Sequence, residues 1–172
     1  LSDALASVAV IIGGALIIPA GLLRKLGVAP PDSGGAEPPP SEQETEDKRR
    51  IELLAMEAVM KAERALGREP RDVSDQNVGY DIESKDPETG DLHFIEVKGR
   101  AHDAANVVLT RNEILRALNV PERWVLAVVL VKDDVAAEPF YVREFDWGQP
   151  SFATTHVTFA MKALKAQGEV PR

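Results

Sequence analysis

Residues 92–100 read LHFIEVKGR, and the stretch ahead of them, residues 79–84, reads GYDIES. Both stretches alternate apolar with polar residues, as half-buried β-strands do. The connecting residues 85–90 include Pro87 and Gly90 and predict a turn. We therefore expect the two strands to pair as a hairpin at the centre of the fold.

An amphipathic helix is predicted ahead of this hairpin. Apolar residues recur at helical spacing from Ile51 to Leu66, Gly67 can serve as the C-cap, and Pro70 prevents quick resumption of the helix. A short strand over residues 71–74 then leads into the hairpin.

After the hairpin, the sequence predicts a second helix and further strands. Residues 110–113 (TRNE) have the form of a capping box, and residues 123–131 (RWVLAVVLV) form a continuous apolar run typical of a strand buried on both faces. The other expected elements are a strand over 106–109, the capped helix to about Leu118, an edge strand over 140–145 and a closing helix over 157–166. This order predicts an α/β sandwich with a central mixed sheet flanked by helices.

The composition divides the chain into three parts. Residues 51–172 are the expected main domain. Residues 29–50 are rich in Pro, Gly, Ser and charge, with almost nothing apolar, which predicts a disordered acidic linker. Residues 1–28 form an apolar segment that we expect to belong to, or pack on, a preceding region. Because the first residue is Leu1 rather than Met, we expect the chain to be part of a longer protein.

Residues 4–23 are almost wholly apolar and long enough to raise the question of a membrane span. Gly13, Gly14 and Pro19 weaken a transmembrane helix, and no basic region precedes the segment as a signal peptide requires. We favour a soluble strand–turn–strand segment and keep the membrane span as the alternative.

Charge and cysteine content bound the function. The chain has 172 residues, no cysteine and a net charge of −8. The lack of cysteine excludes disulfides and thiolate metal sites and fits a reducing cytoplasm, where we expect the protein. The acidic balance counts against a broadly basic nucleic-acid-binding surface, so a nucleic-acid enzyme would need local positive charge and a metal to offset its own carboxylates.

Asp81, Glu96 and Lys98 are the candidate chemical residues. Glu96 and Lys98 lie two apart on one predicted strand and so share a face, whereas Val97 points into the core. The hairpin can bring Asp81 close to Glu96. Two carboxylates beside an ammonium group suit a cation such as Mg²⁺, which binds one or two carboxylates plus waters and phosphate oxygens. The alternative is an exposed strand face with an ordinary charge pair.

Two glycines flank these residues. Gly79 precedes Asp81 by two positions, and Gly99 directly follows Lys98. Because glycine has no Cβ atom, we expect a backbone segment or a ligand to approach closely at both places.

The motifs GYDI (79–82) and FIEVKGR (94–100) resemble the D…(D/E)-x-K signature of restriction-endonuclease-like nucleases. Further motifs narrow the resemblance: I-E-x-x-A-M at 51–56, DVS at 72–74 and LTRNE at 109–113. With them, residues 51 to about 131 are similar to the NO VEIN C-terminal-like domain, found at the C-terminal end of bacterial helicase-like proteins.

This resemblance implies a restriction-endonuclease-like sandwich and hydrolysis of nucleic-acid phosphodiesters, with DNA the expected substrate, Mg²⁺ or Mn²⁺ the cofactor, and a helicase or translocase region of the parent protein as partner. It implies that Asp81 and Glu96 are metal ligands together with the carbonyl of Val97, and that Lys98 is the catalytic lysine. Glu52 matches a first-helix glutamate that some members direct toward the site. An acid favoured by the helix dipole explains Glu52 equally well.

Other candidates have simpler explanations. Asn112 and Glu113 also match the family pattern, although the capping box by itself accounts for Glu113. Arg100, His102 and Arg111 could contact a phosphate backbone or could be ordinary surface residues. The remaining candidates are the aromatic pair Trp124 and Trp147, which we expect in the core.

Two further functions stay open. One is a non-catalytic module of the same fold that binds nucleic acid or protein, which the net charge of −8 favours. The other is a purely structural interaction scaffold.

Overall fold

A computed structural model describes residues 42–76 and 78–172. Its first helix, α2 (Glu42–Ala65), begins at Glu42 rather than at Ile51. The predicted linker was therefore wrong over residues 42–50, while its remainder and the segment 1–28 lie outside the described residues. Residues 42–50 have no apolar face to bury, but most of their charged residues favour a helix. An ion pair between Asp47 and Arg50 (2.8 Å) also links two successive turns of this helix.

The main sheet is mixed, as predicted. Its strands are β1 (Glu69–Asp72), β2 (Ile82–Lys85), β3 (Leu92–Ala101), β5 (Trp124–Lys132), β6 (Val135–Ala136) and β7 (Phe140–Val142). Their order is β1-β2-β3-β5-β6, with β7 also paired to β5. Strands β3 and β5 are parallel, and the other neighbours are antiparallel. The predicted hairpin of β2 and β3 is confirmed, and β1 lies slightly earlier in the chain than predicted.

A second layer covers one face of this sheet. It contains β4 (Asn106–Thr110), α3 (Arg111–Asn119), β8 (His156–Ala160) and α4 (Met161–Gln167). The prediction of one closing helix over residues 157–166 is confirmed from Met161 onward and was wrong before it, because residues 156–160 form a strand that pairs with β4. The β-branched residues Val157 and Thr158 favour that strand, and the helix begins only at Met161.

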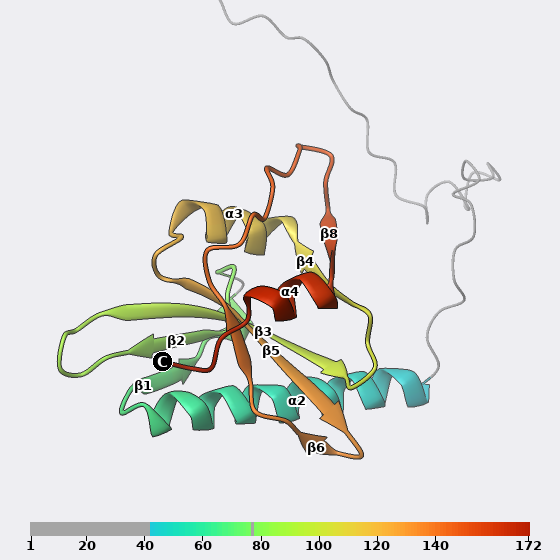
Figure 1. Cartoon of the computed structure of the whole chain (residues 1–172), viewed down its shortest axis with the longest axis horizontal. Coiled ribbons are helices and arrows are strands. Elements are labelled where there is room, and N and C mark those ends of the chain that lie inside the picture. Colours follow the sequence, from blue (N-terminus) through green and yellow to red (C-terminus); the bar gives the residue numbers. More distant parts are fainter. Residues whose placement is uncertain (1–41, 77) are drawn as a thin grey trace, which may run out of the picture. The chain divides into compact units, whose positions relative to one another are not determined.

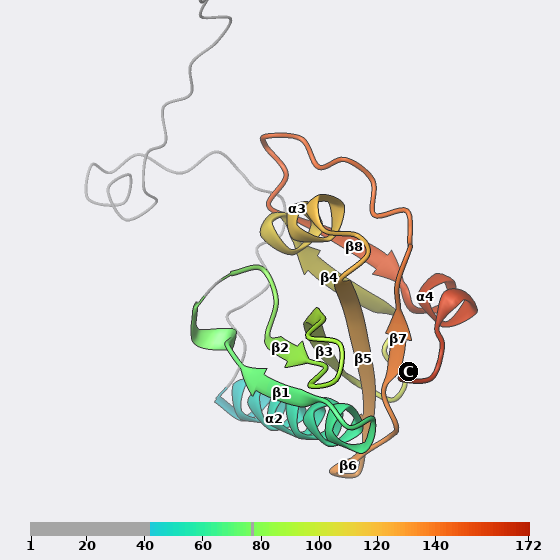
Figure 2. The same ribbon diagram turned by 90° about the vertical axis from the view of Figure 1, so that its left-hand side faces the viewer.

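Strand β5 separates two apolar cores, as expected for a strand buried on both faces. Val125, Ala127 and Val129 pack with Ala55 and Val59 of α2. The alternate β5 residues pack with the second layer, where the core includes Trp124, Leu126, Val128, Ile114, Trp147 and Leu164. Figures 1 and 2 show α2 on one face of the sheet and α3, α4 and the β4–β8 pair on the other. The main domain is therefore a three-layer α/β sandwich.

Within the described part of the chain, no helix has the length and apolar character needed to cross a membrane. The apolar stretch 4–23 lies outside that part.

Candidate active site

Strands β2 and β3 separate at Asp81, and this separation creates the site. Their regular pairing ends at the pair Ile82 and Ile95. The backbone N–H of Asp81 still donates to the Ile95 carbonyl at 2.9 Å. Beyond this point a side chain replaces the backbone as the acceptor: Asp81 Oδ2 accepts the backbone N–H of Val97 at 2.8 Å. Asp81 is thus fixed beside the segment that carries Glu96 and Lys98.

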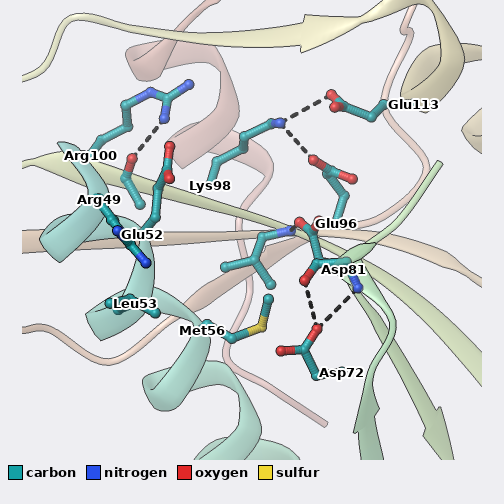
Figure 3. Close-up of a pocket in the computed structure, with 13 residues that line it drawn as sticks. Arg49, Glu52, Leu53, Met56, Asp72, Asp81, Glu96, Lys98, Arg100 and Glu113 are labelled. Atoms are coloured by element: carbon teal, nitrogen blue, oxygen red, sulfur yellow. Dashed lines mark hydrogen bonds and ion pairs between the residues drawn. The ribbon is translucent and has the colours of Figure 1, made fainter. Parts of the chain in front are cut away.

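Glu96 and Lys98 lie on the β3 face that looks toward α3, opposite the face covered by α2. Lys98 Nζ is 2.6 Å from Glu96 Oε1 and 3.1 Å from Glu113 Oε2. The side chains of Glu96, Lys98 and Glu113 are only 4%, 15% and 13% exposed. Figure 3 shows the ammonium group between the two carboxylates. The ordinary exposed charge pair considered from the sequence therefore does not describe this arrangement.

Glu113 contacts both the N-cap of α3 and the ammonium group of Lys98. The capping box predicted from the sequence is present: Thr110 Oγ1 accepts the N–H of Glu113, and Glu113 Oε2 accepts the N–H of Thr110 at 2.9 Å. The same Oε2 atom faces Lys98. The cap thus fixes the Glu113 side chain at the start of α3, in a position to hold the lysine. Because the capping box is by itself a sufficient local reason for Glu113, this second contact was not predicted.

Burial and like charge shift the ionisation of the cluster. Burial raises the pKa of Glu96 to about 8, and the nearby Asp81 and Glu113 carboxylates add to this against the opposing effect of Lys98. Burial also raises the pKa of Asp81, although the hydrogen bond from Val97 opposes it. For Lys98, burial acts to lower the pKa, but Glu96 and Glu113 outweigh burial and raise it. Lys98 therefore keeps its positive charge, whereas burial and the neighbouring carboxylates favour the protonated forms of Asp81 and Glu96.

A cleft of about 500 Å³ opens over these residues. All four sequence-predicted side chains line it, together with the predicted backbone ligand Val97. The complete lining is Arg49, Glu52, Leu53, Met56, Asp72, Ser74, Asp81, Glu96, Val97, Lys98, Gly99, Arg100 and Glu113. An adjoining hollow of about 60 Å³ includes Asn112. The structure thus brings together residues from α2, β3, α3 and the segment before β2.

Comparison with known proteins identifies the family of this chain. The family model described as "Protein NO VEIN, C-terminal" matches residues 51–142, more than half of the chain. The chain belongs to the NO VEIN C-terminal family. No curated protein and no solved structure gives a significant match.

The part that matches the NO VEIN C-terminal family runs from within α2 to the end of β7. It contains Asp81, Glu96, Lys98 and Glu113, so the cluster belongs to the family domain. The β8 strand, the α4 helix and Arg49 lie outside the matched residues.

In this NO VEIN C-terminal domain, both flanking glycines are explained by packing of the protein on itself. A Cβ atom at Gly99 would lie 2.7 Å from the carbonyl oxygen of Ile51 in α2. Gly79 has φ +88°, and a Cβ there would lie 3.1 Å from Cβ of Arg116 in α3. The close approach expected at both places is therefore that of a neighbouring helix.

Glu52 lies at the α2 wall of the cleft, beside Arg100 (Figure 3). Among the described residues, no group of three or more histidine, aspartate or glutamate side chains is close enough together to hold a metal ion. Glu52 therefore does not form a three-carboxylate set with Asp81 and Glu96. It acts instead on Arg100, since its charge opposes the effect of burial on the pKa of that guanidinium group.

Of the other candidates from the sequence, two lie in the core, one lines the cleft and two do not line it. Trp124 and Trp147 are buried and in edge-to-face contact, which confirms them as core residues. Arg111 donates to the carbonyl of Ser151, and neither Arg111 nor His102 is among the residues that line the cleft. Arg100 does line it.

Proposed function

We propose that this domain is a metal-dependent nuclease that hydrolyses nucleic-acid phosphodiester bonds, with DNA as the substrate, and that its sandwich is of the restriction-endonuclease-like type. One observation carries the proposal. A buried Glu96–Lys98–Glu113 cluster and the fixed Asp81 carboxylate share one open cleft, at the point where two strands separate.

The side chains in the cleft fit a divalent cation. Asp81 and Glu96 both line the cleft and offer only oxygen donors, although among the described residues no third acidic side chain is close enough to join them around one ion. Mg²⁺ favours oxygen ligands and is commonly held by two carboxylates, with water and phosphate oxygens completing its shell. Asp81 and Glu96 would hold the ion, with the Val97 carbonyl as a further ligand. When bound, such an ion supplies positive charge that polarises a phosphate group.

Lys98 would stabilise the negative charge that develops during phosphodiester cleavage. Its ammonium group has three N–H donors, and two carboxylates accept from it. One donor is left for a phosphate oxygen or for the attacking water. Because Glu113 is itself fixed by the helix cap, the ammonium is held in place before substrate arrives, which favours electrostatic catalysis.

The net charge of −8 supports a second candidate, a module that binds nucleic acid or protein without cleaving it. Where the ligand is nucleic acid, we propose that a helicase or translocase region of a longer parent protein delivers it.

Cleavage of supercoiled plasmid and single-stranded DNA, with Mg²⁺ or Mn²⁺ and with EDTA, tests the proposal. We expect metal-dependent cleavage that falls more than about 100-fold in Lys98→Met. Lys61→Met, an exposed lysine of α2 outside the cleft, is the matched control and should cleave normally. A folded wild-type protein that cleaves neither substrate would contradict the nuclease and leave the binding module.

A further inference from the structure

One side of α2 forms a wall of the cleft. Arg49, Glu52, Leu53 and Met56 all line it, at the spacing i, i+3, i+4 and i+7 that places side chains along one stripe of a helix. Leu53 is 63% exposed although it is large and apolar. This stripe therefore offers the cleft both a guanidinium group and an uncovered apolar surface.

Arg100 lines the same part of the cleft, beside Glu52 (Figure 3). It follows Lys98 by two positions on β3, so both side chains share a face about 7 Å apart along the strand. Its Nη1 donates to the carbonyl of Gly99 at 2.7 Å, which fixes the guanidinium group. Among the residues that the structure describes, neither Arg49 nor Arg100 has a carboxylate within ion-pair distance.

The charges of the cleft are therefore unevenly divided. Glu96 and Glu113 contact Lys98, whereas the two arginines lie toward α2, with the Glu52 carboxylate beside Arg100 (Figure 3). Arginine is well suited to phosphate because its planar fork donates two parallel hydrogen bonds. Beyond the place proposed for the scissile phosphate, the cleft thus offers a second group of anion-binding side chains.

We propose that Arg100 and Arg49 bind a second phosphodiester of the nucleic-acid strand, on the α2 side of the scissile phosphate, with Leu53 against the adjoining sugar or base. This inference rests on the proposed function, because it places the scissile phosphate beside Lys98. It adds a strand-positioning subsite built from the first half of α2 and the end of β3.

Binding of fluorescent single-stranded and duplex DNA oligonucleotides, measured by anisotropy in Ca²⁺ over a series of salt concentrations, tests the subsite apart from cleavage. The variants are Arg100→Gln and Arg49→Gln, and the latter changes an exposed side chain. Arg64→Gln is the control: it is an exposed arginine of the same helix, about 22 Å further along.

We expect affinity to fall about tenfold in each cleft variant. The slope of log K against log[salt] should decrease by about 0.7 to 0.9 for each phosphate group that the variant no longer neutralises. Arg64→Gln should bind as the wild type does. The subsite would be overturned if all three variants bound with the affinity and the salt slope of the wild type. It would also be overturned if the wild-type protein bound neither oligonucleotide.

Parallel incubation with Mg²⁺ separates the two proposals. Arginine-dependent binding without cleavage would retain the subsite and contradict the nuclease. Cleavage by the wild type, with unchanged binding in Arg100→Gln and Arg49→Gln, would retain the nuclease and contradict the subsite.

Discussion

Lys98 contacts two carboxylates, those of Glu96 and Glu113. If Glu96 engages a cation, Glu113 is the partner that keeps the ammonium group in place. Glu113 can do so because its capping contact with Thr110 already fixes it. The lysine is therefore positioned by the start of α3 as well as by its own strand.

Glu113→Gln tests this role. The amide keeps an oxygen to accept the Thr110 N–H but removes the charge that faces Lys98. We expect cleavage to fall about 10- to 100-fold, as for other supports of a catalytic group, with little change in the free energy of unfolding. Cleavage rates at saturating substrate, together with urea denaturation, measure both effects.

Thr110→Val is the matched control for Glu113→Gln. It removes the side-chain acceptor of the cap and should cost about 1 kcal/mol of stability while leaving the charges around Lys98 unchanged. Equal cleavage by the two variants would show that Glu113 acts only as a cap.

Glu96 makes the stability of the metal-free protein dependent on pH. Its folded pKa of about 8 lies above its ordinary value of 4.5, so the folded state holds the proton more tightly than the unfolded state. Between these values the free energy of unfolding should therefore fall as pH rises, by at most about 1.4 kcal/mol per pH unit from this group.

Urea denaturation in EDTA at pH 5 to 8 measures that slope. Glu96→Gln cannot lose a proton, so its stability should depend less on pH than that of the wild type. Identical slopes for the two proteins would contradict the assigned pKa shift.

At this scale the sequence predicts which of these residues lie together, but not all of the contacts between them. Strand alternation placed Glu96 and Lys98 on one face, and hairpin pairing brought Asp81 to them. The contact between Lys98 and Glu113 could not be predicted in the same way, because tertiary packing alone places α3 beside β3.

At the scale of elements, the hairpin and the β5 strand were predictable because their apolar patterns match their burial. The start of α2 was not, because residues 42–50 are mostly exposed and show no apolar stripe.

The buried Glu63 of α2 could not be predicted from the sequence either. It is fully buried, where its carboxylate accepts the Tyr141 hydroxyl at 2.7 Å and pairs with Arg68 at 3.1 Å. A charged residue in the sequence does not reveal such a partner from a distant strand.

Packing of α2 against β3 depends on Gly99. In Gly99→Ala, the new methyl group would lie 2.7 Å from the Ile51 carbonyl oxygen and 2.9 Å from Cβ of Ala55. We expect the helix to shift, at a cost of about 1–3 kcal/mol in the free energy of unfolding. Because α2 also forms a wall of the cleft, DNA affinity should weaken as well.

Gly90→Ala controls for the loss of a glycine. Gly90 has φ +80°, so alanine is strained there, but nothing lies within 4 Å of its added Cβ. It should destabilise the turn without weakening DNA binding. Unchanged stability and binding in Gly99→Ala would contradict the close packing of α2 on β3.

At the scale of the whole molecule, the two cores on either side of β5 hold the site together. Their helices supply opposite walls of the cleft: α2 contributes Glu52 and Leu53, and α3 contributes Glu113. The α/β class and the mixed sheet followed from the order of predicted elements. The β4–β8 pair did not, because its strands lie about 50 residues apart in the sequence and must be brought together by the fold.

Every proposed catalytic role depends on Asp81 and Glu96 holding a divalent cation. Calorimetric titration with Mn²⁺ at pH 8 measures this directly in the wild type, Asp81→Asn, Glu96→Gln and the exposed α2 control Glu57→Gln. We predict one site in the wild type and in Glu57→Gln, and an affinity at least about tenfold lower in the two cleft variants. A folded wild type that binds no Mn²⁺, or equal binding by all four proteins, would contradict the metal-dependent nuclease.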